Sequence, residues 1–453
     1  MSTLSATGSF DLAVGGDLAA LNTTIANVFS TIHGAVLPYS VNVNVLNIAA
    51  VSIDIVQAPV LSFAATQHFR DEAVEWVNAN TADVQRSAMV ESLLQGSITV
   101  SCASATAVIT FNDGSAPIPL STPLTFGAAV FANPNPSGSG WLMQVQLSGA
   151  EFNASEPTLN QMLNEIAGPA LLNYLNNGVL AAIAVPSISL PGATLAAPIL
   201  SQEQGAAGDD YLVAYSGLSA VTAPDPGTDW PAGTVFVAVD ANVLNTVANT
   251  AWGGLSDLSG NWQEDPFEAS YGVTLGAQIE LTAGSGNQVS GTLTVNGAAK
   301  VCFITPNGLP NLCAGGTISG TVGVSGAISA APDANNNQVI SVQFLGIDDA
   351  DVSLDINIIG ITVPVGPIVD AIVEVIGAAV AGLTMDVYTL NPISLSSIGL
   401  PGYSIGLQDL QLATNAGPGG LPMAMVTAQV GIIQTGNAAS SVNQVQRLEA
   451  LLA

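Results

Sequence analysis

The sequence contains very few basic residues. Only four of its 453 residues are basic (Arg70, Arg86, Lys300 and Arg447), whereas 33 are acidic, so the formal net charge is −29. Nucleic acids and anionic membrane surfaces are bound by clusters of Lys and Arg. The composition therefore excludes nucleic acid as a partner, while a protein partner with a basic surface would complement the charge.

Histidine is also scarce, and the sequence shows no pattern typical of catalysis or of a metal site. The two histidines, His33 and His68, lack the convergent partners that a catalytic triad or a zinc site requires. The densest acidic segment, GIDDADVSLD (346–355), does not have the spacing of an EF-hand calcium loop. We therefore expect a protein that is not an enzyme and that uses no metal and no cofactor.

Cysteines and long apolar runs are equally few. Cys302 and Cys313 flank a turn-rich segment and can form a disulfide if that segment folds back as a hairpin, whereas Cys102 is expected to be an inert buried thiol in a strand. The most apolar stretch, 356–385, contains two prolines and two acidic residues, so no transmembrane segment is expected. No signal peptide is visible, which favours a soluble protein, cytoplasmic or exported without a cleaved signal.

Apolar and turn-forming residues are abundant. Hydrophobic residues make up 49% of the chain, the mean hydropathy is +0.49, and there are 46 glycines. This composition excludes a disordered chain and favours many strands and turns. Apolar residues alternate at 41–45 and 51–55, and strand-like patterns return at 273–293 and 318–328, which predicts long antiparallel strands.

The chain also contains an internal repeat, in which four blocks recur in the same order with an offset of about 200 to 225 residues. The first block is a short strand that leads into a helix with the sequence LNT, followed by IAN in one half and VAN in the other. A strand, a long helical pattern and a closing strand come next in each half. The matched pairs are 12–27 with 237–249, 142–152 with 339–349, 159–175 with 367–383, and 185–192 with 391–402.

We therefore predict two similar units, 1–222 and 234–453, joined by a Pro/Gly-rich linker at 223–233. The first helix is expected to begin after Asp17 and to end at Gly34, with His33 beside the free carbonyl groups of the last turn. The corresponding helix of the second unit is expected to begin after Asp240. Strands and amphipathic helices in this order predict an α+β fold of long antiparallel sheets.

The order of these elements resembles the tubular lipid-binding superfamily, which includes bactericidal/permeability-increasing protein and the lipid transfer proteins of plasma. TVFVAVDANVLNTVANTAW (234–252) resembles the start of that family's second domain, and SISLPGATLAAPIL (187–200) resembles the end of its first. The opening GSFDLAVGGDLAALN (8–22) is similar to bacterial members encoded beside clostridial neurotoxins. The resemblance implies an elongated pseudo-dimer in which each unit is a long curved antiparallel sheet wrapped around amphipathic helices.

Two departures from that family concern its ligands and its cross-links. The antibacterial members carry a basic tip that binds lipopolysaccharide, and this chain has no cluster of basic residues. The mammalian members have a disulfide in the first domain, whereas Cys302 and Cys313 lie in the second half of this chain. The resemblance therefore implies the fold, without lipopolysaccharide binding.

We expect the protein to carry or bind lipid or other apolar ligands in one elongated hydrophobic groove per unit, lined by the apolar stripes of its helices. Two alternatives stay open. The same fold with a filled core would suit a protein-interaction, accessory or structural component, and the Gly/Asn/Thr-rich composition would also suit a β-helical adhesin. The residues expected to line the grooves are Leu21, Ile25, Val28, Phe29, Leu163, Ile166, Leu244, Val247, Ile372, Val375 and Ile376.

Overall fold

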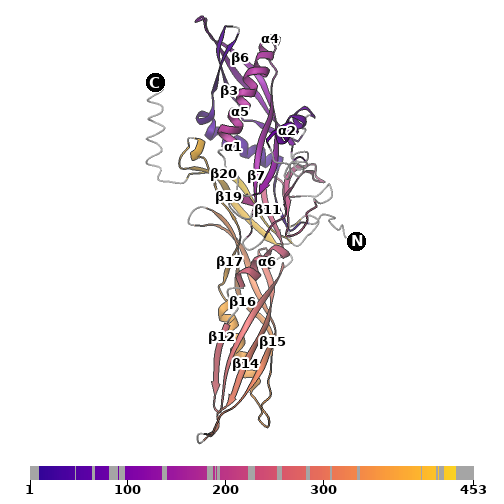
Figure 1. Cartoon of the computed structure of the whole chain (residues 1–453), viewed down its shortest axis with the longest axis vertical. Coiled ribbons are helices and arrows are strands. Elements are labelled where there is room, and N and C mark those ends of the chain that lie inside the picture. Colours follow the sequence, from indigo (N-terminus) through magenta and orange to yellow (C-terminus); the bar gives the residue numbers. More distant parts are fainter. Residues whose placement is uncertain are drawn as a thin grey trace.

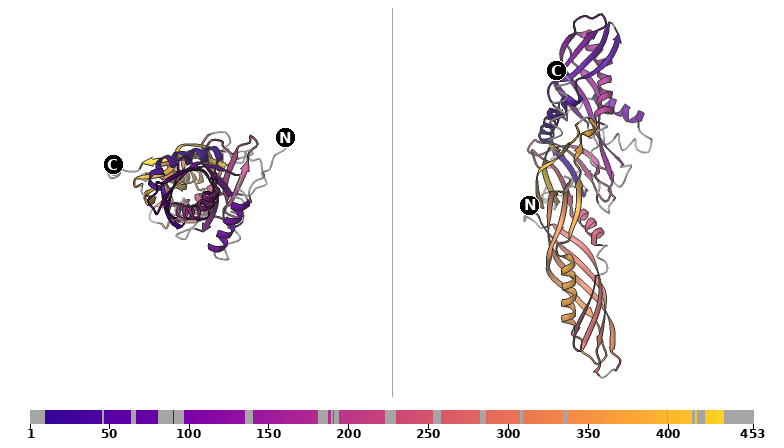
Figure 2. Two further views of the ribbon diagram at one scale, coloured as in Figure 1. Left: turned by 90° about the horizontal axis from the view of Figure 1, so that it is seen from above. Right: turned by 90° about the vertical axis from the view of Figure 1, so that its left-hand side faces the viewer.

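The fold is described from a computed structural model of the whole chain. The molecule is a long rod with one β-sheet toward each end and a third sheet across its middle (Figure 1, Figure 2). The expected α+β architecture of long antiparallel sheets with few helices is confirmed. The structure describes residues 10–45, 47–63, 67–80, 90, 97–134, 140–180, 187–188, 190, 194–222, 230–252, 258–281, 286–306, 309–333, 337–398, 400–414, 417 and 423–434.

The middle sheet combines strands from both halves of the sequence. At its centre β1 and β11, which open the two repeated blocks, pair antiparallel with Ala13 opposite Ala238. On each side the next strand, β10 or β20, comes from the end of the same half, so matched segments occupy symmetrical places in the sheet. In spatial order the strands are β18 (Ile393–Ser394), β19 (Tyr403–Thr414), β20 (Met423–Gln434), β11 (Val235–Asp240), β1 (Leu12–Asp17), β10 (Asp210–Ser216) and β9 (Ile199–Gln204).

Both faces of the middle sheet are buried, as the runs of apolar residues in its central strands require. One face joins the large core that extends into the second half, and the other packs against a separate aromatic cluster. In that cluster the buried carboxylate of Glu203 accepts hydrogen bonds from Tyr215 Oη at 2.6 Å and from Trp230 Nε1 at 3.3 Å. Burial raises the pKa of Glu203. Trp230 thereby fixes the chain that leads into β11.

The sheet of the first half is ordered β2-β3-β5-β6-β7-β8, and β4 pairs with β5 beside it. Helix α1 (Leu18–Val36) follows β1 directly, α2 (Gln67–Asn80) lies against β6 and β7, and a long helix runs along β7 as α4 (Pro157–Met162), η1 (Leu163–Ala167), α5 (Gly168–Tyr174) and η2 (Leu175–Val179). The strands are β2 (Tyr39–Val45), β3 (Ile48–Ile55), β4 (Val60–Ser62), β5 (Ser97–Phe111), β6 (Ile118–Pro134), β7 (Trp141–Phe152) and β8 (Ser187–Ile188).

The sheet of the second half is a simple meander, β12-β13-β14-β15-β16-β17, whose strands reach 21 residues in β15. Helix α7 (Val365–Val380) packs against β12 and β16, and Tyr271 Oη donates a hydrogen bond to the Ala371 carbonyl of α7 at 3.0 Å. Helix α6 (Ala241–Trp252) follows β11, and a short 3₁₀ turn, η6 (Ser396–Ile398), precedes β19. The strands are β12 (Leu258–Glu264), β13 (Phe267–Leu281), β14 (Gln288–Phe303), β15 (Leu312–Pro332), β16 (Gln338–Asp355) and β17 (Thr384–Leu390).

Asparagine side chains on the helices bind backbone groups of the strands beside them. Asn22, in the LNT sequence of α1, accepts a hydrogen bond from Leu61 N at 2.7 Å and donates one to Leu61 O at 3.2 Å. Asn245, in the LNT sequence of α6, accepts from the backbone N–H of Ile279 on β13. Backbone groups at a sheet edge need partners. The repeated asparagine therefore performs the same task in both halves, which joins helix to sheet.

The sequence predicted where α1 and α6 begin and where α1 ends. Asp17 caps α1 and Asp240 caps α6 through side-chain hydrogen bonds to Ala20 N and Val243 N, as expected. The prediction that Gly34 ends the first helix was wrong. The helix runs to Val36, because Leu37 N still donates to His33 O at 2.8 Å and Leu37 then takes an extended conformation.

Other sequence predictions concerned the three cysteines and membrane-spanning helices. Cys302 and Cys313 face each other on β14 and β15 and form a disulfide. Cys102 is a free, buried thiol, and burial raises its pKa to about 12. In the part of the chain that the structure describes, no helix combines the length and apolarity needed to span a membrane. The boundaries of the two units stay a prediction, and residues 223–229 of the linker lie outside the described residues.

Candidate functional site

The apolar stripe of α1 is incompletely covered by protein. Leu21, Ile25, Val28 and Phe29 are only partly buried, and of all the residues of α1 only Ala20 and Val36 are buried. The helix packs beside β1, β4, β10 and β20, so it bridges the middle sheet and the flank of the first sheet. An amphipathic helix normally buries its apolar face against the core. Here the apolar face of α1 borders two cavities.

The first space, here called the outer cavity, lies between α1 and the inner face of the first sheet and has a volume of about 350 Å³. Its lining is almost entirely aliphatic and aromatic. Ile405 on β19 also lines it, so a strand from the second half of the sequence helps to close it. The lining residues are Thr24, Ile25, Val28, Phe29, Ile32, His33, Val36, Leu37, Ile55, Pro59, Val100, Phe126, Leu147, Leu175, Val179, Leu180 and Ile405.

The second space, the central cavity, also has a volume of about 350 Å³ and lies on the face of the middle sheet. Gly16, Ala214 and Ala428 form part of its floor, and their small size leaves this face of the sheet open. Leu21 of α1 is part of its wall, and Val130, Met143 and Leu390 reach it from the two end sheets. The central cavity therefore lies where all three sheets meet.

The two cavities follow one another along α1. Leu21 lines the central cavity and Ile25, one helical turn later, lines the outer cavity, which continues to His33. Because α1 rises about 1.5 Å per residue, Leu21 and His33 are separated by about 18 Å along the helix axis. This length suits an extended hydrocarbon chain.

The outer cavity has a polar end. His33 Nε2 lies 2.7 Å from Asp54 Oδ1 on β3, and each of the two side chains is 33% exposed. Among the described residues that line the outer cavity, His33 is the only titratable one. The sequence predicted that His33 would interact with the carbonyl groups at the helix end. Its side chain instead bonds a carboxylate on the neighbouring strand, which ties the C-terminal turn of α1 to the first sheet.

The structure brings together four of the residues predicted to line a groove and separates the others. Leu21, Ile25, Val28 and Phe29 line the two cavities. Leu163 is fully buried in the core of the first half and Ile166 is partly buried. In the second half Leu244, Val247, Ile372 and Ile376 are buried and Val375 packs against the core. A ligand-binding role for all eleven residues stays a prediction.

Sequence reasoning missed the far walls of the cavities. Val100, Phe126 and Leu147 lie on strands whose alternation predicts a buried face, yet the pattern does not say which buried residues face an open space. Ile405 is distant in sequence and reaches the outer cavity only through the middle sheet. Helical periodicity on α1 was the one signal in the sequence that identified lining residues.

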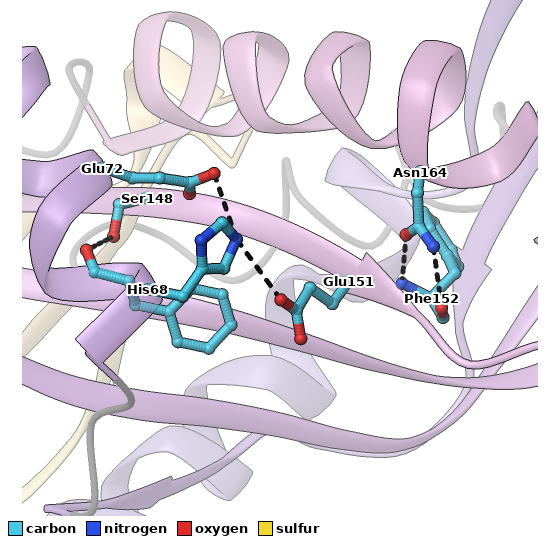
Figure 3. A network of polar contacts seen from close by, with 7 residues as sticks. His68, Glu72, Ser148, Glu151, Phe152 and Asn164 are labelled. Carbon is cyan, nitrogen blue, oxygen red and sulfur yellow. Dashed lines mark hydrogen bonds and ion pairs between the residues drawn. The ribbon is translucent and has the colours of Figure 1, made fainter. Parts of the chain in front are cut away.

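A third hollow, a polar crevice of about 860 Å³, lies on the outside of the first half between α2, β7 and the long helix (Figure 3). His68 Nε2 lies 3.3 Å from Glu72 Oε1 and 3.4 Å from Glu151 Oε1, and burial raises the pKa of Glu72. Asn164 binds both the N–H and the carbonyl of Phe152 (Figure 3). These contacts join α2 and the long helix to β7.

In the crevice, Ser148 and His68 do not form a nucleophile–base pair. The hydroxyl of Ser148 donates to the Phe69 carbonyl at 3.1 Å, so it is directed away from His68 (Figure 3). A nucleophilic hydroxyl would need a hydrogen bond to the imidazole. Within the described residues, no group of three or more His, Cys, Asp or Glu side chains is placed to hold a metal ion. His68 lies in the first turn of helix α2 (Gln67–Asn80).

Several solved structures are similar to this chain. No protein-family model matches the chain, and no curated protein is similar to it in sequence. Among solved structures, P47 of Clostridium botulinum E1 has 8% identity and a TM-score of 0.36, with 93% of this chain and 99% of that chain covered. Lipopolysaccharide binding protein has 11% identity and a TM-score of 0.36, with 95% and 100% covered. P47 from Clostridium botulinum A2 has 8% identity and a TM-score of 0.35, with 93% and 97% covered. At these TM-scores the similarities support no further argument.

Proposed function

We propose that this protein is a non-enzymatic binder of lipids or other apolar small molecules, which it holds in the cavities along α1. The observation that carries the proposal is the partly buried stripe of α1 facing two apolar cavities of about 350 Å³ each. Pockets for small ligands are typically about 300–1,000 Å³ and mostly apolar. Each ligand methylene buried there contributes about 0.8 kcal/mol, so a long chain can bind without any charged contact.

A second candidate function is a protein-interaction or accessory component that holds no ligand. It is favoured by the second half, where Ile368, Ile372 and Ile376 of α7 have no exposed surface and the core is filled by side chains. A partner with a basic surface would suit the net charge of −29. This candidate differs from the first in predicting that purified protein contains no apolar molecule.

The test is extraction of the purified protein with organic solvent, followed by mass spectrometry, and uptake of the uncharged fluorescent dye Nile red by a separate native sample of the protein. We expect an apolar molecule in the extract and saturable dye binding. Val28→Trp should reduce dye binding at least about fivefold, because the indole fills the outer cavity. Ala26→Trp is the matched control, since Ala26 is exposed on the opposite face of α1.

The outcomes separate the two candidates. Clean protein that also fails to take up the dye would exclude the ligand binder and leave the interaction component. Equal loss of dye binding in the two Trp variants would show that the dye binds elsewhere, and would equally remove the cavities along α1 from the proposal. Circular dichroism of both variants checks that each retains its fold.

A further inference from the structure

The charges around the two cavities are distributed unevenly. The described residues of the central cavity are all uncharged, with Tyr388 buried in its wall. The outer cavity has polar side chains only from Thr24 and His33, both on α1. Asp54 lies directly behind His33, bonded to it at 2.7 Å. A ligand that lies along α1 would therefore place its hydrocarbon end in the central cavity and its polar end near His33.

We infer, building on the proposed function, that the ligand is an uncharged amphiphile, such as a long-chain alcohol or a sterol, whose hydroxyl group lies beside His33 and Asp54. The carboxylate of a fatty acid would meet the Asp54 carboxylate at this end, and like charges at short distance repel each other. The imidazole of His33 already has a carboxylate partner, so it offers no unpaired cation. A hydroxyl group can donate a hydrogen bond to the Asp54 carboxylate without bringing a charge of its own.

The net charge of the protein also disfavours an anionic ligand. Four basic residues against 33 acidic ones give a net charge of −29, so an anionic ligand approaches through a repulsive field. Of the four, the two that the structure describes are Arg70 on α2 and Lys300 on β14, and neither lines the outer or the central cavity. An ammonium head would need the carboxylate that His33 occupies, so a positive head gains less than the field alone suggests.

The experiment uses three ligands with the same C18 chain and different heads: octadecan-1-ol, octadecanoate and octadecylammonium. Each is titrated at pH 7 against full-length protein loaded with Nile red, at concentrations below ligand aggregation. We expect octadecan-1-ol to displace the dye at a concentration at least about tenfold lower than either charged ligand. If none of the three displaces the dye, the proposed function itself fails at this site.

Asp54→Asn provides the decisive variant, because it removes the charge and keeps an oxygen that can accept a hydrogen bond. We expect its affinity for octadecanoate to rise about tenfold, while its affinity for octadecan-1-ol changes less than about threefold. Asp351→Asn, an exposed acid on β16, is the matched control and should change neither. Octadecanoate or octadecylammonium binding as tightly as the alcohol to the wild-type protein would overturn the inference and leave the proposed function intact. An unchanged octadecanoate affinity in Asp54→Asn would also overturn it.

Discussion

Helices α1 and α7 carry the same kind of apolar stripe but bury it to different extents. In α7, Ile368, Ile372 and Ile376 have no exposed surface. In α1 the stripe from Leu21 to Phe29 is only partly buried and faces two cavities. An apolar stripe in a sequence therefore predicts that a face will meet apolar surroundings, and does not predict whether protein or ligand provides them.

The difference follows from where each helix packs. Helix α7 lies within the concave side of its own sheet, against β12 and β16, and the aliphatic side chains of that sheet fill the space around it. Helix α1 leaves the middle sheet directly from β1 and packs beside β4 and β20, so no single sheet curves around it. The first half thus leaves room along its helix, whereas the second half closes.

The largest expected difference between the two helices concerns their contribution to stability. Ile372→Ala should lower the free energy of unfolding by about 2–5 kcal/mol, because it opens a cavity in a filled core. Ile25→Ala should lower it by only about 1 kcal/mol, because Ile25 is partly buried beside an existing cavity. Urea denaturation of the two variants measures both values, and equal losses would contradict the contrast.

A bound ligand should sharpen the contrast. With octadecan-1-ol at about 100 times its Kd, the opening of α1 should be suppressed about 100-fold, since opening releases the ligand. The amides of α7 should exchange at an unchanged rate, because no ligand touches that helix. Hydrogen exchange followed by mass spectrometry gives both rates, and protection of α7 equal to that of α1 would refute a ligand site along α1 alone.

Asp240, the N-cap of α6, provides a prediction on the pH dependence of stability. Burial, together with the nearby Asp11 carboxylate, raises the pKa of Asp240 to about 7. A carboxyl group whose pKa is raised in the folded state binds its proton more tightly there than in the unfolded chain, so it stabilises the folded state at low pH. This stabilisation is lost as the pH rises from about 4 to 7. Stability should therefore fall across that range by about 1–3 kcal/mol.

Asp240→Asn tests this prediction while retaining the oxygen that caps α6. Its free energy of unfolding should vary less between pH 4 and 7 than that of the wild type, and Asp355→Asn on the exposed part of β16 should leave the wild-type slope unchanged. A slope in Asp240→Asn as steep as in the wild type would assign the pH dependence to other groups, such as Glu203.

The smallest expected effects come from the repeated asparagines. Asn22→Ala removes two hydrogen bonds to Leu61, and Asn245→Ala removes the bond to Ile279, so each should lower the free energy of unfolding by about 1–2 kcal/mol. Only Asn22→Ala should also weaken Nile red binding, because α1 forms the cavity wall. Dye binding that falls equally in both variants would contradict a site along α1.

The sequence predicted the parts of this structure that depend on local patterns. Strand alternation, the caps Asp17 and Asp240 and the matched LNT blocks were sufficient for the α+β class and for the starts of α1 and α6. The sequence prediction placed the end of α1 too early, because a helix can continue past a glycine such as Gly34 when the next residues maintain its hydrogen bonds. The cavities depend on where α1 packs and on residues such as Ile405, whose approach is set by the middle sheet. No local pattern records that geometry.

The central claim is that an apolar ligand binds in the cavities along α1. Photo-crosslinking tests it most directly: a long-chain alcohol with a diazirine near its methyl end is bound to the protein, activated by light and located by peptide mass spectrometry. We predict labelling of the peptides that contain β1 and α1, at residues 12–36, and of the facing strands β10 and β11, with loss of labelling when unlabelled octadecan-1-ol is added. Labelling of α7 at residues 365–380, or labelling that the competitor does not reduce, would contradict it.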